Sequence, residues 1–308
     1  TVPTVTGTYN DNGNLTASTT WQEFKSPTAF DDLVFWWSFE EGSGKSAIDY
    51  SGNNLHGSLE YDTKYDDENG LFGTALYFDG NGDRVRRNFD PLMAVTEYTI
   101  SIWMKGQRDN DYWAGIIGRA GRIHCLWAGQ SNADNNWFFH HRYGDASGGN
   151  NGAANTGRYK HNQWYNVVMW NDGKTSATYV DGAKATVGVV NGALYQNTRE
   201  LWLAANDGGG GQWKGWMEDV RLYNKALSST DITALYGGGE GDKPSGAVAD
   251  IYTITGTQNP TNYTATGLPR GIIVDPNTGI IRGTASTVGT FPVTVTAGNL
   301  AGDSVSEI

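Results

Sequence analysis

Short apolar runs, each closed by glycine, asparagine or aspartate, recur along most of this 308-residue chain. Typical runs are residues 33–39, 98–104 and 164–170, which are rich in aromatic and β-branched side chains. Four Asp-Gly or Asn-Gly pairs follow such runs, at 79–80, 172–173, 181–182 and 191–192. These pairs suit tight hairpin turns because both residues tolerate a positive φ. Strand-length runs between such turns predict an all-β chain folded as antiparallel sandwiches.

Composition agrees with this fold class and excludes several functions. With 12 tryptophans, 16 tyrosines and 10 phenylalanines, the chain has enough large apolar side chains for a substantial core. No apolar run is long enough for a membrane helix, so we expect no membrane insertion. The net charge of −11 argues against nonspecific binding to nucleic acid. The single cysteine, Cys125, excludes a disulfide framework, and we expect it to be a buried thiol.

Changes in composition divide the chain into four segments. Residues 1–32 are polar and threonine-rich and predict an extended arm or hairpin. Residues 33–237 hold most of the aromatic runs and end in one short helix signal at 228–236. The glycine-rich stretch 238–250 is a linker by composition. Residues 251–308 contain no tryptophan, and their Thr, Val and Ile content predicts a second, smaller sandwich.

Seven motifs in the larger segment occur in a characteristic order. They are residues 37–44, 49–57, 72–80, 98–103, 163–168, 179–182 and 215–228. In this order they resemble a laminin-G-like domain, a concanavalin A-like two-sheet jelly roll found in secreted bacterial proteins. The resemblance implies two stacked antiparallel sheets with a concave face, on which relatives often hold glycans.

Residues 251–308 resemble the Ig-like repeats of the HE-PIG type in bacterial surface proteins. The motifs that carry this resemblance are residues 263–284 and 293–299. It implies an Ig-like spacer domain that positions a neighbour. Together the two resemblances imply a secreted or cell-surface location and a longer multidomain parent protein.

A structural calcium ion is the cofactor that the sequence suggests. Asp49 opens a turn rich in glycine and asparagine that includes Asn54, and its oxygens could converge on a calcium ion. The resemblance implies that a carboxylate at the Glu218 position shares this ion. Relatives usually have aspartate there, so either Glu218 or Asp219 would be the ligand. Alternatively, Asp49 caps its own turn, and Glu218 and Asp219 form a solvated pair.

Charge points to a ligand face in the middle of the chain. Residues 100–165 carry seven Lys and Arg against four Asp, a net +3, whereas the remainder carries 15 against 29, a net −14. The predicted strand 137–143 places Phe139, His141 and Tyr143 on one face and His140 and Arg142 on the other. Arginine and histidine beside aromatic rings suit a carboxylated or sulfated sugar. The alternative is an ordinary core face backed by a solvated face.

Further candidates surround this strand. Arg119 belongs to the same positive segment, and Trp113, Trp127 and Trp213 lie near polar or glycine-rich turns where they could be exposed sugar platforms. The tryptophans at strand positions are expected in the core. These are Trp36, Trp37, Trp103, Trp164, Trp170, Trp202 and Trp216.

Catalytic signatures are sparse. The sequence contains neither the closely spaced carboxylates of laminarinase-type hydrolases nor a Gly-x-Ser-x-Gly elbow. We therefore expect a non-catalytic, calcium-stabilised carbohydrate-binding module for an acidic polysaccharide. One alternative is a polysaccharide lyase with His140 or His141 as base, Tyr143 as acid and Arg142 on the substrate carboxylate. Another is an adhesion or structural module without a glycan site.

Overall fold

The chain forms two compact units in the computed structural model. The larger unit comprises Thr28–Asp49 and Asn53–Asp242, and the smaller includes Lys243–Ile308. The structure describes residues 5–6, 28–107, 113–119, 123–130, 137–144, 150–152, 159–190, 196–205, 211–242, 250–256, 260–268, 272–283, 293–299 and 302–307. Among these residues, no helix has the length and apolarity needed to cross a membrane.

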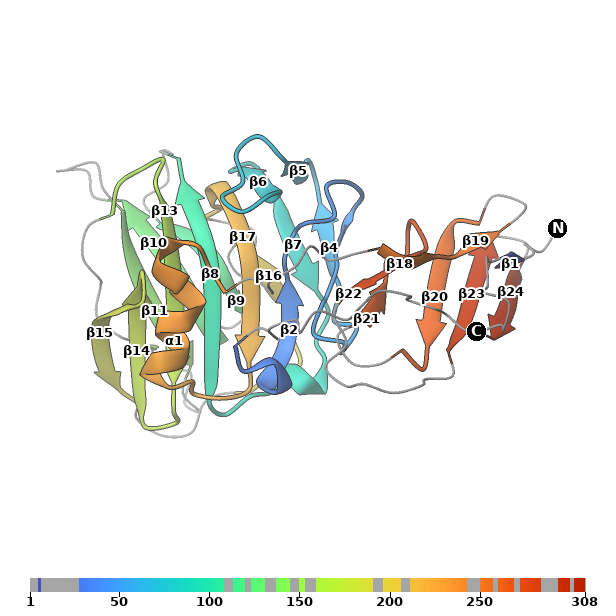
Figure 1. Cartoon of the computed structure of the whole chain (residues 1–308). Helices are drawn as coiled ribbons and strands as arrows, with labels where there is room; N and C mark the ends of the chain where they lie inside the picture. Colours follow the sequence, from blue (N-terminus) through green and yellow to red (C-terminus); the bar gives the residue numbers. More distant parts are fainter. Residues whose placement is uncertain are drawn as a thin grey trace. The chain divides into compact units, whose positions relative to one another are not determined.

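Two antiparallel sheets make up the larger unit (Figure 1). Sheet I contains, in spatial order, β12 (Asn150–Gly152), β11 (Trp137–Gly144), β10 (Ile123–Gln130), β9 (Trp113–Arg119), β16 (Leu201–Leu203), β7 (Arg84–Arg87), β4 (Gly57–Glu60) and β3 (Ser46–Ala47). Sheet II contains β15 (Ala183–Val189), β14 (Thr175–Val180), β13 (Trp164–Asn171), β8 (Tyr98–Gly106), β17 (Lys214–Tyr223), β6 (Ala75–Asp79) and β5 (Lys64–Asp66), and β2 (Leu33–Trp37) pairs with β17. The predicted two-sheet sandwich is confirmed.

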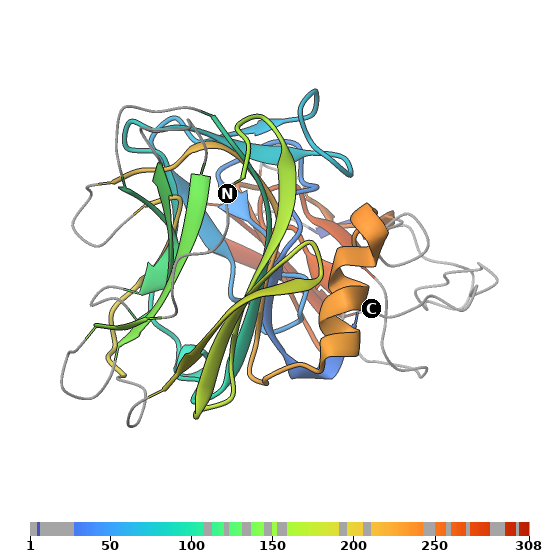
Figure 2. The ribbon, with the colours of Figure 1, turned by 90° about the vertical axis from the view of Figure 1, so that its left-hand side faces the viewer.

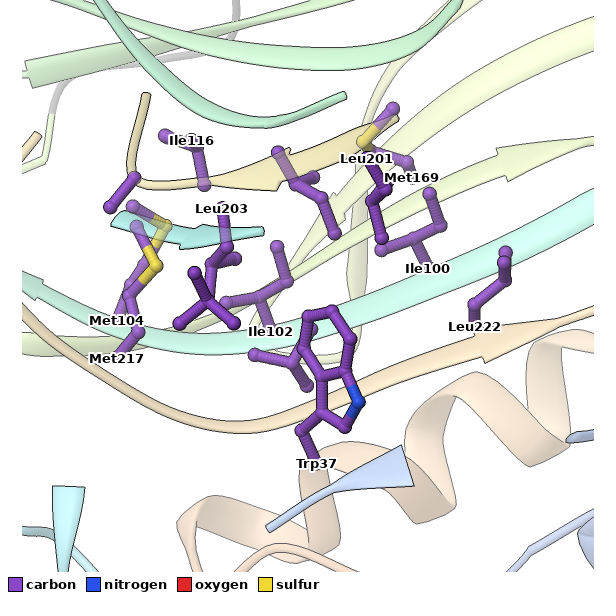
Figure 3. Packing of buried hydrophobic residues seen from close by; sticks show 14 of the residues in the cluster. Trp37, Ile100, Ile102, Met104, Ile116, Met169, Leu201, Leu203, Met217 and Leu222 are labelled. Carbon is purple, nitrogen blue, oxygen red and sulfur yellow. The ribbon is translucent and has the colours of Figure 1, made fainter. Parts of the chain in front are cut away.

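The core lies between the inner faces of the two sheets. Strand alternation sends Leu203 of sheet I and Ile102 and Met217 of sheet II into one buried cluster (Figure 3). Trp37 lies in the same cluster, and its indole Nε1 donates to the Leu55 carbonyl at 2.9 Å. Its apolar ring is thus fully buried without leaving the polar nitrogen unpaired.

Helix α1 (Ser229–Tyr236) covers part of the outer face of sheet II, as Figure 2 shows. It begins where the sequence predicts, because Ser228 and Asp231 form a reciprocal capping box. It ends at Gly237, which has a φ of 57°. The Tyr236 ring stacks on Trp103 of β8, with centroids 5.9 Å apart. Sheet I lies on the side of the sandwich away from this helix.

A buried arginine joins the two ends of the larger unit. Arg221 in β17 binds Asp219 through Nε at 2.9 Å and the Asp242 carboxylate through Nη1 at 2.9 Å. The same Asp242 carboxylate accepts from the backbone N–H of Thr28 at 2.5 Å. The first and last residues of the sandwich are therefore held by one ion-pair network.

The smaller unit contains two three-stranded sheets. One consists of β18 (Asp250–Thr253), β22 (Ile280–Gly283) and β21 (Ile272–Val274), and the other of β20 (Asn262–Thr266), β23 (Thr294–Asn299) and β24 (Gly302–Glu307). Its core includes Ile254, Ile281 and Val295. The short strand β1 (Val5–Thr6) pairs with β19 (Thr255–Gly256). Most of the arm or hairpin predicted over residues 1–32 lies outside the described residues.

Candidate functional site

The residues expected to bind calcium have protein partners instead. Asp49 is fully buried, and its carboxylate accepts from the backbone N–H groups of Trp36 at 2.8 Å and Leu55 at 2.9 Å. This is the turn-capping role that the sequence left open for Asp49. Asn54 is exposed and adopts a left-handed φ of 58° in the same turn.

Glu218 and Asp219 are also buried, so a solvated pair is wrong. Glu218 accepts from the backbone N–H groups of Leu71 at 2.7 Å and Phe72 at 3.1 Å. Asp219 accepts from the Trp36 indole at 2.6 Å and pairs with Arg221. In the described part of the chain, no three His, Cys, Asp or Glu side chains are grouped to hold a metal ion. As a set, these residues do not fit a shared calcium ion, and calcium binding stays a prediction.

Two of the expected ligand-binding residues prove to be structural. Trp213 is only 1% exposed and packs in the core, so its proposal as a sugar platform is wrong. Arg119 is buried at the end of β9, where its guanidinium donates to the Met93 carbonyl at 3.2 Å and the Gln196 amide at 3.1 Å, and also to Asn197. These contacts hold neighbouring loops together, so Arg119 is not available to a ligand. Trp113 is 36% exposed at the start of β9.

The strand predicted to carry the ligand face is β11, and it lies in sheet I. Its register places His140 opposite Trp127 and Arg142 opposite Cys125. Phe139 of this strand is buried in the core. The side chains of Trp127, Cys125, His140, His141, Arg142 and Tyr143 lie outside the described residues.

A different group of side chains occupies the outer face of sheet I. In β7, Val85 points into the core while Arg84 and Arg86 lie on the other face. The register places Ser58 and Trp202 on either side of Arg86, and Glu60 beside Arg84. Three strands distant in sequence therefore bring their polar and aromatic residues together.

We name Glu60, Tyr61, Arg84, Arg86 and Trp202 the arginine face. The Glu60 carboxylate receives Nε of Arg84 at 2.6 Å and Nε of Arg86 at 2.5 Å. The Arg84 guanidinium carbon lies 4.7 Å from the Trp202 ring centroid and 5.0 Å from that of Tyr61. Within the described residues, no carbonyl or carboxylate is hydrogen-bonded to the Nη atoms of either arginine.

The aromatic members leave room for a partner. Tyr61 is 61% exposed, with its ring against Gly82, where a Cβ would lie 3.2 Å from the ring. Trp202 is partly exposed, and Gly118 faces it across the strand pair without a side chain to cover the indole. Its Nε1 atom is buried and has no hydrogen-bond partner among the described residues, so only the ring itself is open to a ligand.

Glu60 orients the two arginines and remains charged. Partial burial works to raise its pKa, but the hydrogen bonds from Arg84 and Arg86 outweigh this and hold the pKa below its usual value. Two guanidinium groups against one carboxylate leave the arginine face with one net positive charge. The arrangement can accept an anion through fixed Nη donors beside two aromatic rings.

The sequence interpretation missed this group. The net charge of the segment 100–165 does not indicate it, because Glu60, Arg84 and Trp202 come from three other segments of the chain. The sequence interpretation also assigned Trp202 to the core. The available signals were the Arg-Val-Arg alternation at 84–86 and the lone indole between Leu201 and Leu203. Among the other strand tryptophans, Trp36, Trp37, Trp103 and Trp216 are buried as predicted, whereas Trp164 and Trp170 are partly exposed.

Solved structures with similar folds include several binding domains. Domain 4 of AbnA, an extracellular arabinanase of Geobacillus stearothermophilus in complex with arabinotriose, has 18% identity and a TM-score of 0.50, covering 66% of this chain and 97% of that one. The binding domain of Paraclostridial Mosquitocidal Protein 1 has 13% identity and a TM-score of 0.56, covering 87% and 76%. The botulinum neurotoxin serotype D binding domain has 12% identity and a TM-score of 0.51, covering 90% and 74%. At these identities the likeness shows the fold alone.

Family comparison gives two adjacent assignments. Residues 79–233 match the model of the concanavalin A-like lectin/glucanases superfamily, and residues 233–308 match that of the "Putative Ig domain". No curated protein matches the chain. The first match spans half of the chain and agrees with the two-sheet sandwich. The chain therefore belongs to the concanavalin A-like lectin/glucanases superfamily, and its sandwich is followed by an Ig-like domain.

Proposed function

We propose that this chain binds an acidic polysaccharide through the arginine face. The observation that carries the proposal is the pair of arginines held at Nε by Glu60, with their Nη atoms directed to neither carbonyl nor carboxylate in the described structure. A carboxylate or sulfate accepts hydrogen bonds from such planar donors with good geometry. The apolar C–H face of the same sugar ring would lie against Trp202 or Tyr61.

An ordinary surface salt bridge explains less of this geometry. Salt bridges at a surface stabilise a protein little, and they need no aromatic neighbours. Here one guanidinium lies over two rings, on a sheet face that α1 does not cover. Because Glu60 fixes both arginines in advance, a ligand would lose less entropy in ordering them.

The structural relatives support a binding role by analogy. The arabinanase domain was solved with arabinotriose, and the two toxin domains are named as binding domains. A polysaccharide ligand agrees with the secreted or cell-surface location and the longer parent protein that the sequence predicts. A calcium ion has no part in this proposal.

Binding of the full chain to polygalacturonate, alginate and a sulfated polymer tests the proposal. Isothermal titration should show that Arg84→Ala and Arg86→Ala each weaken binding by about 1.5–3 kcal/mol, the range for a hydrogen bond to a charged group. That loss corresponds to roughly tenfold or more in Kd. Added salt should also weaken binding, because exposed charges are screened over about 8–10 Å.

Lys174→Ala is the matched control, because it removes one positive charge from an exposed turn of sheet II. It should leave affinity unchanged, and the melting temperature of every variant should be recorded. Equal effects of Lys174→Ala and Arg84→Ala would refute the arginine face. A loss confined to Arg142→Ala would instead locate the site on β11, as the sequence predicts. Formation of an ultraviolet-absorbing unsaturated product from the uronate polymers would favour the lyase alternative.

A further inference from the structure

The outer face of sheet II carries a second group of aromatic and basic side chains. Five residues face one another in register on five neighbouring strands, and we name them the lysine–tryptophan row. They are Lys64 of β5, Tyr77 of β6, Trp216 of β17, Lys105 of β8 and Trp164 of β13. Their chain neighbours Leu76, Met104 and Met217 are buried in the core, so the row lies on the opposite face of the sheet.

Each lysine of the row lies beside an aromatic ring. The Lys105 ammonium lies 4.2 Å from the Trp216 ring centroid and 5.3 Å from that of Trp164. The Tyr77 and Trp216 rings are 5.1 Å apart, and Lys64 lies 5.8 Å from the Tyr77 ring. Four strand spacings give the row a length of about 19 Å. A surface of this length suits several units of a chain-like ligand rather than a single small molecule.

Hydrogen bonds from neighbouring residues fix the row. The Trp216 indole donates to Asp66 at 2.8 Å, and the Lys105 ammonium donates to the Asn69 carbonyl at 3.2 Å. The Tyr77 hydroxyl donates to the Gln107 amide oxygen at 3.3 Å. The side chains are thus ordered before any ligand arrives, which lowers the entropy cost of binding.

Most of the row can be reached from solvent. Lys64 is exposed, and Tyr77, Lys105 and Trp164 are partly exposed, whereas Trp216 is nearly covered by its neighbours. Tyr236 of α1 covers Trp103, which lies two residues before Lys105 on β8. Helix α1 therefore packs on the adjacent position of the sheet and leaves the row partly open.

Nearby carboxylates offset the two lysines. Partial burial works to raise the pKa of Asp66, but the hydrogen bonds from Trp216 and Asn69 outweigh it, so this carboxylate stays ionised. Burial, followed by the carboxylates of Asp79 and Asp83, raises the pKa of Tyr77. An anionic ligand would be repelled by these groups. With Asp66, Asp79 and Asp83 beside Lys64 and Lys105, the row and its neighbours carry no net positive charge.

We propose that the lysine–tryptophan row is a second polysaccharide site, which takes a neutral sugar chain. The sugar rings lie with their C–H faces on Trp164 and Tyr77, and Lys105 and Lys64 donate hydrogen bonds to hydroxyl groups. Two sites on opposite faces of one sandwich would let the protein hold a neutral and an acidic polymer together. This proposal stands independently of the arginine face.

The test is affinity electrophoresis of the full chain in gels that contain β-glucan, xylan or arabinan as neutral probes. At least one probe should retard the wild-type protein, and Trp164→Ala should raise its Kd by about tenfold or more. Lys105→Met keeps the hydrophobic stem and removes the charge, so it should also weaken retardation. Lys184→Met is the matched control, because Lys184 lies 5.9 Å from the Trp170 ring and 5.3 Å from the Tyr179 ring, outside the row.

The two sites make separable predictions. Arg84→Ala should leave retardation by the neutral probe unchanged, while Trp164→Ala should leave binding of the acidic polymers unchanged. Melting temperatures confirm that each variant is folded. The second site is refuted if no neutral probe retards the wild-type protein or if folded Trp164→Ala and Lys105→Met are retarded like the wild type. An equal loss in Lys184→Met, or a loss of neutral binding in Arg84→Ala, would also refute it.

Discussion

At the scale of single residues, the buried charges of the larger unit have structural roles. Burial opposes the charged form of Arg221, but Asp219 and Asp242 outweigh it and raise the pKa of this guanidinium. From the sequence, Asp219 was an alternative to Glu218 as a ligand of the calcium ion that the laminin-G-like resemblance implies. Arg221 could not be foreseen as its partner, because the bulge between Glu218 and Arg221 that shapes this part of β17 is not visible in the residue pattern.

Removing one carboxylate should show how much this network contributes. Asp242→Ala deprives Arg221 and the Thr28 N–H of their shared acceptor. We expect the free energy of unfolding to fall by about 1.5–3 kcal/mol, because Nη1 of Arg221 and the Thr28 N–H lose a charged acceptor, while Asp219 still pairs with Arg221. Urea unfolding measures the change. Asp32→Ala, which breaks the exposed pair with Lys225, is the control and should change little. A similar effect of both variants would contradict the account.

The buried carboxyl group of Asp83 should make the stability of the fold depend on pH. Burial raises its pKa, the Asp79 carboxylate adds to this, and the Asp79 N–H opposes it. Because the folded-state pKa exceeds the unfolded value near 3.8, stability falls as pH rises from that value through the folded-state pKa. Asp83→Asn keeps an acceptor but cannot ionise. Its melting temperature should exceed that of the wild type at pH 7, and the gap should narrow near pH 4. An equal or lower value at pH 7 would overturn this reasoning.

At the scale of strands, the sequence predicts where each strand or helix lies along the chain better than it predicts which strands pair in a sheet. The run 98–104 and the capped helix at 228–236 appear as β8 and α1 because alternation and capping are local signals. The arginine face depends on β4, β7 and β16 lying side by side, although more than 100 residues separate Arg87 from Leu201. No local sequence pattern indicates that these three strands pair. The ligand face was therefore predicted on β11, where basic and aromatic residues are close together in the sequence.

Gly57 tests the packing of these strands. A Cβ at this position would lie 2.5 Å from Cγ1 of Val85 and 3.2 Å from the Trp37 ring. Gly57→Ala should therefore force β4 away from β7 and lower the free energy of unfolding by about 1–3 kcal/mol. Ser58→Ala, at the exposed neighbouring position, is the control and should stay close to the wild type in urea denaturation. An unchanged midpoint for Gly57→Ala would mean that the strands are less closely packed.

At the scale of the whole molecule, two separate cores explain why composition alone divides the chain. Aliphatic and aromatic side chains, Trp37 among them, build the core of the sandwich, and Ile, Val and Ala side chains build that of the Ig-like unit. The family matches meet at residue 233, within the helix that ends the sandwich motifs. The family and fold could thus be read from the sequence.

Removal of calcium with a chelator tests whether the protein binds the calcium ion that the sequence predicts. Asp49 and Glu218 already accept backbone hydrogen bonds, and Asp219 already pairs with Arg221. On this geometry we expect the melting temperature of the full chain to be the same in excess EDTA and in millimolar calcium. If a calcium ion bound only the folded state, added calcium would raise the melting temperature by mass action. A clear fall in EDTA that added calcium reverses would restore the calcium prediction and require other ligands.

The central claim is that the outer face of sheet I binds an acidic sugar through Arg84 and Arg86. A crystal structure of the chain with a bound oligogalacturonate tests it most directly. We expect a carboxylate of the ligand within about 2.7–2.9 Å of Nη atoms of both arginines, and a sugar ring against Trp202 or Tyr61. An oligosaccharide bound on β11 or elsewhere, with the arginine face in contact with solvent alone, would contradict it.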